Sequence, residues 1–408
     1  MPQGFFTASD LLVKRPLPSL LPRCGACGLL KTCQSPKMPV AGRGERKILV
    51  VGEAPGATED EHNQPFIGQS GQLLQRTLEQ ADVNLFRDCW VTNSLACRPV
   101  DNATPTEKQI DYCRPNLLRA LQELKPEVIL LLGASAVKSL LSWLWKEDVG
   151  KIGRWVGWQI PSQKLNTWVC PTWHPAAILR NERDQQSGVM ELLFKRHLKA
   201  ACSLKGRPWA EVPDYRKDIR LIFDPLEADV YLDGFLGGAE SSGKPVAFDY
   251  ECEGLKPDNG KLQIVSCSLS DGESTCAFPW HGPVIKRMQT FLRSLVPKIA
   301  SNAKYEERWT RKVFGHGVRN WAWDTMLAAH ALDNRPGITG LKFQAFVQLG
   351  VDAWDEQAKP FLRADGSNAK NRIREVSLDK LLLYNAYDSL HEWQVAQVQA
   401  RQLGIKLC

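Results

Sequence analysis

The sequence has no apolar stretch long enough to cross a membrane and no leader of the secretory type. Its longest apolar run, Val128–Leu132, stops at Gly133, whereas a spanning helix needs about 20 predominantly apolar residues. Residues 1–9 lack the charged segment followed by an apolar segment that marks a signal peptide. Internal repeats and low-complexity tracts are absent too. These absences exclude an integral membrane protein and predict a cytoplasmic one.

The second half of the chain has no excess of charge of either sign. Residues 206–408 contain 26 Lys and Arg and 26 Asp and Glu, whereas residues 1–205 contain 26 and 19. The whole positive excess therefore lies in the first half, most of it within the first fifty residues. A basic surface suits contact with a nucleic-acid backbone. A solvated basic arm is the alternative that charge alone leaves open.

Twelve cysteines without a leader are expected to be metal ligands and small buried side chains, not a disulfide framework. Cys24 and Cys27 form a Cys-x-x-Cys, a spacing that presents two thiolates to one metal centre. Cys97 precedes Arg98-Pro99, and Cys113 follows it after a long loop of the kind that a metal cluster bridges. By themselves these four residues are compatible with zinc or with an iron–sulfur cluster.

The first half alternates buried strands with helices. Residues 47–52 and 127–133 are predicted as buried parallel strands, and residues 71–81, 106–124 and 134–145 as helices, with Thr104 or Thr106 as a possible N-cap. This order predicts an α/β domain with a doubly wound parallel sheet. Active-site loops in such sheets lie beyond the carboxyl ends of the strands, and the glycine-rich segment Gly52-Glu53-Ala54-Pro55-Gly56 occupies such a position.

A second α/β pattern begins after a Pro- and Gly-containing stretch. We predict domains at residues 1–205 and 215–408, joined by a linker at 206–214. In the second domain a Gly/Ser turn is expected at 237–243. Strands are predicted at 246–250, 262–269 and 274–279, and helices at 286–296, 304–313, 325–332 and 378–402.

Several spaced motifs of the first half resemble the iron–sulfur (family four) uracil-DNA glycosylases. They are Gly52–Gly56, Pro65-Phe66-Ile67-Gly68, Gly71-Gln72-Leu73-Leu74, Thr92-Asn93-Ser94-Leu95-Ala96-Cys97-Arg98-Pro99, Asn102 and Trp173-His174-Pro175. They occur in the family's order over roughly residues 20–200. The resemblance implies excision of uracil from DNA by hydrolysis of the N-glycosidic bond.

The resemblance also implies a role for each matching residue. Cys24, Cys27, Cys97 and Cys113 would hold a [4Fe–4S] cluster, and Glu53 would position or activate the attacking water. Phe66 would stack on the extruded base and Asn93 would read its edge, with Gly52 and Ala54 in the base-binding loop. Asn102 would assist in the pocket, and His174 would stabilise charge growing on the uracil O2.

Two positions depart from the family pattern. Gln69 stands where a basic residue is usual, and Ala176 stands where serine usually follows His-Pro. Either change could weaken backbone contacts or alter the accepted base, so a modified pyrimidine is an alternative substrate. Cys33 competes as a cluster ligand but falls outside the family spacing.

The second half contains a carboxylate pair of the kind that holds divalent metal ions, although Asp-x-Glu by itself is common. Asp249 and Glu251 are two residues apart on a predicted strand and so share one face. Paired carboxylates hold two divalent ions about 3.5–4 Å apart in two-metal sites. Downstream stand Asn302-Ala303-Lys304-Tyr305-Glu306, then Asp324 at a helix start, and then Tyr384 and Asp388 one helical turn apart.

This set resembles the 3′–5′ proofreading exonuclease domain of DNA polymerase I, which implies an RNase H-like mixed sheet. By that resemblance Asp249, Glu251, Glu306 and Asp388 would bind two Mg²⁺ or Mn²⁺ ions, and Tyr384 would orient the hydrolytic water. Glu306 departs from the family, which has aspartate there. Asp324 is predicted as a helix cap and not as a ligand.

Together the halves look like a bacteriophage replication protein that excises uracil from DNA, trims 3′ ends and acts with a separate DNA polymerase chain. A rival interpretation keeps the exonuclease and makes the first domain a non-catalytic DNA-binding or polymerase-docking module. In a third interpretation both halves are inactive and the protein is a processivity or assembly factor.

Overall fold

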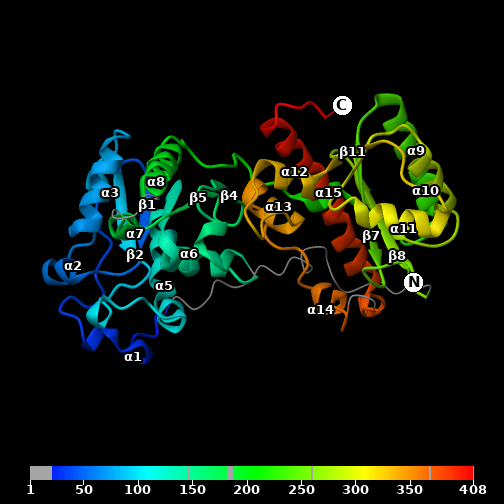
Figure 1. Ribbon diagram of the computed structural model, residues 1–408. Helices are drawn as coiled ribbons and strands as arrows, with labels where there is room; N and C mark the ends of the chain where they lie inside the picture. The colour runs from blue at the N-terminus through cyan, green and yellow to red at the C-terminus, as the bar shows by residue number, and fades with distance from the viewer. Residues whose placement is uncertain (1–20, 146, 182–186, 259–260, 367–368, 408) are drawn as a thin grey trace. The chain divides into compact units, whose positions relative to one another are not determined.

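The computed structural model describes residues 21–145, 147–181, 187–258, 261–366 and 369–407 (Figure 1). Residues 1–9, predicted not to form a leader, lie outside these ranges, as does the start of the basic segment. The chain divides into two compact units, one of residues 1–159 and 167–207 and the other of 160–166 and 208–408. Within the described residues no helix is both long and apolar enough to cross a bilayer.

The first unit contains a parallel sheet with the strand order β2-β1-β3-β5. The short strand β4 (Ile160–Ser162) lies in the segment 160–166, which belongs to the second unit. The four parallel strands are β1 (Ile48–Gly52), β2 (Cys89–Asn93), β3 (Val128–Leu132) and β5 (Thr167–Thr172). All residues of β1 and β3 are buried. This is the pattern of a parallel sheet covered on both faces, and it confirms the predicted α/β class.

Helices lie on both sides of this sheet (Figure 1). They are α1 (Cys24–Cys27), α2 (Ala57–His62), α3 (Gln69–Glu79), α4 (Leu85–Asp88), α5 (Glu107–Leu124), α6 (Gly133–Leu144), α7 (Pro175–Asn181) and α8 (Ser187–Cys202), with 3₁₀ turns at Leu29–Lys31, Val100–Asn102 and Ile152–Arg154. Ile48 and Val50 of β1 pack with Leu74 of α3 and Phe194 of α8 in one core cluster. Thr106 is the N-cap of α5, as predicted, and accepts from the backbone N–H of Gln109.

The second unit contains a mixed sheet with the order β11-β10-β7-β8-β9-β6. Its strands are β6 (Ile219–Leu221), β7 (Val246–Cys252), β8 (Ile264–Ser270), β9 (Thr275–Pro279), β10 (Lys298–Ala300) and β11 (Trp321–Asp324). Strand β7 runs parallel to β10 and antiparallel to β8. The mixed sheet confirms the predicted fold of this half.

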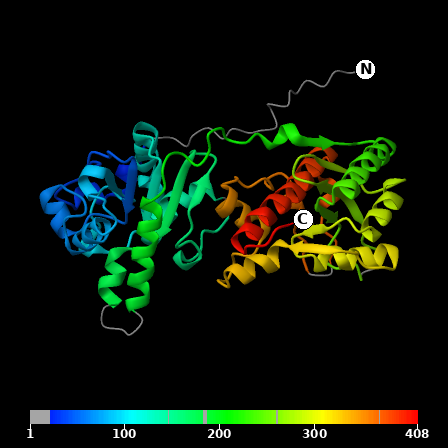
Figure 2. The ribbon, with the colours of Figure 1, turned by 90° about the horizontal axis from the view of Figure 1, so that it is seen from above.

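The helices of the second unit include a long C-terminal one that packs on the sheet. They are α9 (Pro225–Ser242), α10 (Val284–Arg293), α11 (Lys304–Phe314), α12 (Thr325–Leu332), α13 (Leu341–Leu349), α14 (Lys359–Leu362) and α15 (Leu378–Gln402), with 3₁₀ turns at Tyr215–Asp218 and Ile373–Glu375. Helix α15, red in Figure 2, lies against β7, β8 and β9. It therefore presents its buried face to the strand that carries Asp249 and Glu251.

The prediction of a Gly/Ser turn at residues 237–243 is wrong. Helix α9 continues through this segment to Ser242, and only Gly243, with φ of +66°, ends it in the left-handed region. The hydroxyl groups of Ser241 and Ser242 donate to the carbonyls of Gly237 and Gly238, one turn back. The buried Ala228, Leu232, Leu236 and Ala239 recur at helical spacing. Packing of that apolar stripe outweighs the low helix propensity of the glycines.

Candidate functional sites

In the first unit, the predicted site residues gather at the carboxyl edge of the parallel sheet. Gly52 ends β1 and is paired with Asn93, which ends the neighbouring β2. Glu53 follows directly after Gly52, and His174 comes two residues after the end of β5. Carboxyl ends of parallel strands meet at one edge, so motifs far apart in sequence converge there.

Gly52 leaves room for two predicted base-binding side chains. A Cβ atom on Gly52 would lie 2.4 Å from Oδ1 of Asn93 and 2.6 Å from Cζ of Phe66. Such distances are far below ordinary carbon contact of about 3.5–4.0 Å. Glycine is thus required where these two side chains meet the strand end. Phe66 is 5% exposed and belongs to the core cluster of this unit.

The loop that carries Phe66 is held in a strained conformation by its neighbours. Phe66 has a φ of +61°, which is unusual for an aromatic residue. Its carbonyl accepts from Nε2 of Gln75, and its backbone passes so close to Gly71 that an added Cβ would lie 2.0 Å from the Phe66 carbonyl oxygen. Glu59 accepts from the backbone N–H groups of Gly56 and Gly68, which ties both loops together.

Glu53 is partly buried and fixed by a partner that the sequence analysis missed. The hydroxyl of Ser135, in the first turn of α6, donates to Oε2 of Glu53 over 2.7 Å. The carbonyl of Glu53 accepts from the N–H of Leu95 over 3.1 Å. Ser135 is 3% exposed, so this hydrogen bond is sheltered and orients one oxygen of the carboxylate.

The ring of His174 is oriented by a backbone hydrogen bond. Its Nδ1 accepts from the backbone N–H of Ala176 over 3.2 Å, so the ring proton resides on Nε2. Burial lowers the pKa of His174 below its usual value, against the opposing effect of the Glu53 charge. Gly133 faces the histidine, since an added Cβ there would lie 2.8 Å from Cβ of His174. Because the donor at Ala176 is its backbone N–H, this hydrogen bond does not require the serine side chain that the family usually has at position 176.

Asn102 has a hydrogen-bond partner outside this group. It is exposed, has a φ of +54°, and its Oδ1 accepts from Nε of Arg98 over 2.8 Å. Gln69, the first residue of α3, is exposed as well. Their predicted roles toward DNA stay predictions.

The four predicted cluster ligands line one cavity together with apolar side chains. Cys24, Cys27, Cys97 and Cys113 share its wall with Leu29, Leu30, Leu95 and Tyr112. The backbone N–H groups of Lys37 and Ala96 point at the sulfurs of Cys97 and Cys113 over 3.2 and 3.3 Å. Nδ2 of Asn116 adds a third contact, to Cys113, over 3.4 Å. Donors of this kind stabilise thiolates and tune metal clusters.

The four cysteine side chains of this cavity are buried or half-buried. Burial raises the pKa of Cys97 to about 12 and also raises that of Cys113. Metal coordination is what makes such buried thiols thiolates. Cys33 packs beside this group but does not line the cavity.

The cysteine cavity adjoins the loop of Glu53. Ala54 packs against the apolar cluster of Leu29, Leu95, Cys97 and Ile110. Leu95 lines the cavity and donates its N–H to the carbonyl of Glu53. A group bound by the cysteines would therefore stabilise the backbone of the loop that carries Glu53.

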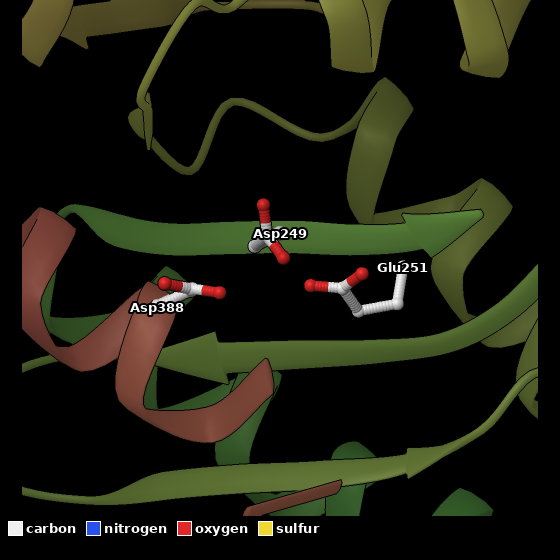
Figure 3. A group of neighbouring side chains, drawn as sticks. All are labelled: Asp249, Glu251 and Asp388. Atoms are coloured by element: carbon white, nitrogen blue, oxygen red, sulfur yellow. The ribbon is translucent and has the colours of Figure 1, made fainter. Parts of the chain in front are cut away.

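In the second unit, three carboxylates converge as the sequence predicts. Asp249 and Glu251 extend from β7 toward Asp388 of α15 (Figure 3). One carboxylate oxygen from each of the three lies within 4.8 Å of the others. Burial raises the pKa of Asp249 and of Glu251 well above the usual range, and neighbouring carboxylates raise both further. A divalent cation would relieve this repulsion.

Two side chains that were not predicted as site residues orient these carboxylates: Asn385, which lies between Tyr384 and Asp388, and Trp354. Nδ2 of Asn385 donates to Oδ2 of Asp249 over 2.7 Å, and the Oδ1 atom of Asn385 accepts from Ser266. The indole N–H of Trp354 donates to Oδ1 of Asp388 over 2.9 Å. Burial raises the pKa of Asp388 to about 6, with Lys342 and this hydrogen bond opposing the rise.

Tyr384 lies one turn before Asp388 and is 8% exposed. Nζ of Lys342, from α13, donates to its phenol oxygen over 3.2 Å and lies 3.4 Å from Oδ2 of Asp355. The Lys342 charge also lowers the pKa of Asp249, Glu251 and Asp388. Lys342 thus links the predicted water-orienting phenol to the carboxylate group.

Glu306 lies in the first turn of α11, 1% exposed, outside the group of three. Burial raises its pKa well above the usual range, and the charge of Asp249 raises it further. Asp324 caps α12, accepting from the N–H groups of Met326 and Leu327, and also accepts from Asn302 and Ala303. All four of these donors are backbone N–H groups, as expected of a structural cap.

Comparison with known proteins gives a separate family match for each half of the chain. The profile of the uracil DNA glycosylase superfamily matches residues 39–198, and that of a 3′–5′ exonuclease matches residues 238–388. The type-4 uracil-DNA glycosylase of Pyrobaculum aerophilum is 37% identical over 174 residues, which cover 40% of this chain and 83% of the relative. A DNA polymerase of Bacillus phage SP01 is 24% identical over 329 residues, covering 73% of this chain and 34% of the polymerase.

Among solved structures, NrnC of Brucella melitensis aligns with a TM-score of 0.34 and 18% identity over 46% of this chain and 82% of its own. The two family matches and the two sheets define a two-domain protein, a uracil-DNA glycosylase fold joined to a 3′–5′ exonuclease fold. Within that class, the chain belongs to the type-4 uracil-DNA glycosylases, here carrying an exonuclease domain in the same polypeptide.

Proposed function

We propose that the chain hydrolyses two different bonds in DNA, the N-glycosidic bond of uracil in the first unit and 3′-terminal phosphodiesters in the second. The convergence of Gly52, Glu53, Asn93 and His174 at one sheet edge supports the first activity. The three carboxylates that meet within 4.8 Å support the second.

Uracil excision requires that the base leave the duplex, at a cost of a few kcal/mol. Phe66 would stack on the flipped base, worth about 1–3 kcal/mol. Asn93 offers both a donor and an acceptor to the edge of uracil, a pattern that cytosine does not match. The Gly52 backbone leaves space for both side chains. Discrimination would thus reside at the ends of β1 and β2.

Bond cleavage produces a cationic sugar and an anionic base, and the site has a group for each charge. Glu53, oriented by Ser135, would position or activate water beside the sugar. His174 would donate its Nε2–H to the uracil O2, since Nδ1 is committed to the backbone N–H of Ala176. A neutral donor here is consistent with the lowered pKa of His174.

The four cysteines would hold a [4Fe–4S] cluster with a structural role. Their shared cavity and the N–H groups aimed at Cys97 and Cys113 support this assignment. When bound, the cluster would stiffen the segments around Leu95 and Ala54 that adjoin the Glu53 loop. The glycosidic chemistry itself stays with Glu53 and His174.

In the exonuclease unit, Asp249, Glu251, Glu306 and Asp388 would bind two Mg²⁺ or Mn²⁺ ions. Such ions, when bound, activate water and stabilise charge on the phosphodiester. Tyr384, held by Lys342, would orient the attacking water. Asn385 and Trp354 would keep Asp249 and Asp388 in position. Trimming would release nucleotides from a 3′ end.

The substrate is DNA, and a separate DNA polymerase is the partner we propose. The alignment with the phage SP01 polymerase covers 73% of this chain, more than either domain alone. The alignment therefore includes parts of both domains, and the relative is named a DNA polymerase. Removal of uracil and trimming of 3′ ends would both serve DNA synthesis.

A 3′-blocked, uracil-containing oligonucleotide in the presence of a chelator tests the first activity. Alkali cleaves the abasic site that excision leaves, and this product should vanish in Glu53→Ala. If uracil and modified pyrimidines both yield no product, the first domain is a binding module, the alternative that Gln69 and Ala176 raised. An unblocked strand with Mg²⁺ tests trimming, with Asp249→Ala as the inactive control.

A further inference from the structure

The side chain of Arg98 connects an exposed turn to helix α2 in the first unit. Its Nε donates to Oδ1 of Asn102 over 2.8 Å, and its Nη1 lies 4.0 Å from Oδ2 of Asp60. Asp60 is 2% exposed, and its carboxylate also accepts from two backbone N–H groups of the segment 34–35. A buried carboxylate that is itself fixed therefore holds the guanidinium, and the guanidinium holds Asn102.

This contact determines which end of the Asn102 amide faces outward. A guanidinium has N–H donors only and no acceptor, so the amide atom that faces Arg98 is the oxygen. The NH₂ group is directed away from Arg98. Among the described residues, Nδ2 of Asn102 has no hydrogen-bond acceptor. Because Asn102 is exposed, its two amide N–H donors are available to a ligand that accepts hydrogen bonds.

The backbone of the turn holds Asn102 in this position. Asp101 and Asn102 have φ values of +52° and +54°, in the left-handed region that Asn and Asp adopt more readily than other side chains. The backbone N–H groups of Asn102 and Ala103 donate to the carbonyls of Pro99 and Val100 over 3.2 and 3.0 Å. The turn is therefore ordered by its own hydrogen bonds, which reduces the cost of ordering it when a ligand binds.

The supports of Arg98 are anchored at the loop that carries Glu53. Leu95, three residues before Arg98, donates its N–H to the carbonyl of Glu53 over 3.1 Å. On the other side, Asp60 donates its N–H to the carbonyl of Gly56, the last residue of that loop, over 2.9 Å. These two hydrogen bonds place Arg98 and its turn next to the uracil pocket.

We propose that Asn102 donates to a phosphate oxygen of the DNA strand that carries the uracil, and that Arg98 positions its amide. This inference rests on the proposed uracil excision. Asn side chains are common donors to DNA phosphates, and the guanidinium places a positive charge beside the amide. The base edge would be read by Asn93 at the end of β2, so the exposed turn is left to contact the backbone.

Replacement of Asn102 by aspartate distinguishes a donor from an acceptor. Aspartate keeps an oxygen for Arg98, has no N–H donor when ionised, and adds a negative charge. Asn102→Gly removes the side chain without straining the left-handed backbone. Asn63→Asp is the matched control for charge, because Asn63 is also exposed and has a φ of +51°.

Single-turnover excision from a 3′-blocked uracil oligonucleotide, measured with a chelator over a range of protein concentrations, gives a half-saturating concentration and a maximal rate. A hydrogen bond to a charged group is worth about tenfold or more in an equilibrium constant. Asn102→Gly should therefore raise the half-saturating concentration about tenfold. Asn102→Asp should raise it further, because its carboxylate repels the phosphate. Maximal rates should stay near the parental rate, and Asn63→Asp should match the parent.

A half-saturating concentration for Asn102→Asp at or below that for Asn102→Gly would overturn the assignment, because Asn102 would then not act as a donor. Methylphosphonate linkages beside the uracil lack the phosphate charge and should abolish the difference between the two variants. If the difference persists, the partner is not a phosphate. A loss confined to the maximal rate would also overturn the assignment. Absence of excision by the parent chain would instead refute the uracil-excision function, and the inference with it.

Arg98→Met tests the positioning role separately. If Arg98 acts through Asn102, Arg98→Met should raise the half-saturating concentration in the parent and add nothing in Asn102→Gly. Multiplied losses in the double variant would disprove positioning and would indicate that Arg98 stabilises the fold through Asp60 or contacts DNA itself. If Arg98→Met does not fold, the variants of the exposed Asn102 still decide whether the amide is a donor to phosphate.

Discussion

Replacement of Gly52 by alanine is expected to disable the uracil pocket while leaving the exonuclease intact. The added Cβ would lie 2.4 Å from Oδ1 of Asn93 and 2.6 Å from Cζ of Phe66. Ordinary contacts need about 3.5–4.0 Å, so both side chains must retreat by about 1 Å. Misplacement of that size can cost about 100-fold in rate. We expect a loss of that order in uracil excision.

The same clash should have a measurable but smaller effect on stability. Overpacking of a buried site costs about 1–3 kcal/mol, which thermal melting would register as a lower midpoint. Gly153→Ala is the matched control in the same unit, because an added Cβ there meets nothing within 4 Å and its φ is not positive. Gly153→Ala should excise uracil at the parental rate.

The assay is single-turnover excision from a 3′-blocked uracil oligonucleotide, with trimming of an unblocked strand measured in parallel. The pocket assignment predicts slow excision and parental trimming for Gly52→Ala. Excision within threefold of the Gly153→Ala control would refute it, since Asn93 and Phe66 would then not be the groups that hold the base.

Further predictions concern both sites. Burial lowers the pKa of His174, so its neutral form persists below pH 6.5. The rate of uracil excision should therefore decline only at pH values below 6.5. A decline in rate that is centred at or above pH 6.5 would contradict this. The pKa of Asp388 is raised to about 6 by burial, so protons compete with cations and the half-saturating Mg²⁺ for trimming should rise as the pH falls towards 6. A half-saturating Mg²⁺ concentration that does not change with pH would count against Asp388 as a metal ligand. Lys342→Met removes the hydrogen bond to Tyr384 and should slow trimming about tenfold or more in kcat. Lys359→Met, which removes the other cation near Asp355, should not slow it. If Tyr384→Phe and the double variant Lys342→Met/Tyr384→Phe lose the same factor in kcat, Lys342 acts through the phenol. If the double variant loses the product of the two single factors, this role of Lys342 is disproved.

Much of the framework was predictable because strong periodic patterns coincide with buried elements. The apolar strands β1 and β3 and the long helix α15 appear where the sequence indicated. Strand β2 was not predicted, since its alternating exposure leaves a weak signal over only Cys89–Asn93. The glycines of α9 suggested a turn because local propensity carries no information about the apolar stripe beneath them.

The site was predictable where motifs are contiguous and not where single residues support them. Asp249, Glu251 and Asp388 carry spacing signals and do converge. Ser135, Trp354 and Lys342 come from other segments, and Asn385 lies between Tyr384 and Asp388. Only tertiary contact reveals the roles of these four residues.

The central claim is that one chain contains two independent hydrolytic sites. It is tested most directly with a 5′-labelled strand that has an internal uracil and a free 3′ end, incubated with Mg²⁺ and divided for alkali treatment. Glu53→Ala should trim without forming abasic sites, and Asp249→Asn should form abasic sites without trimming. Loss of both products in either single variant, in a chain that melts like the parent, would contradict two separate sites.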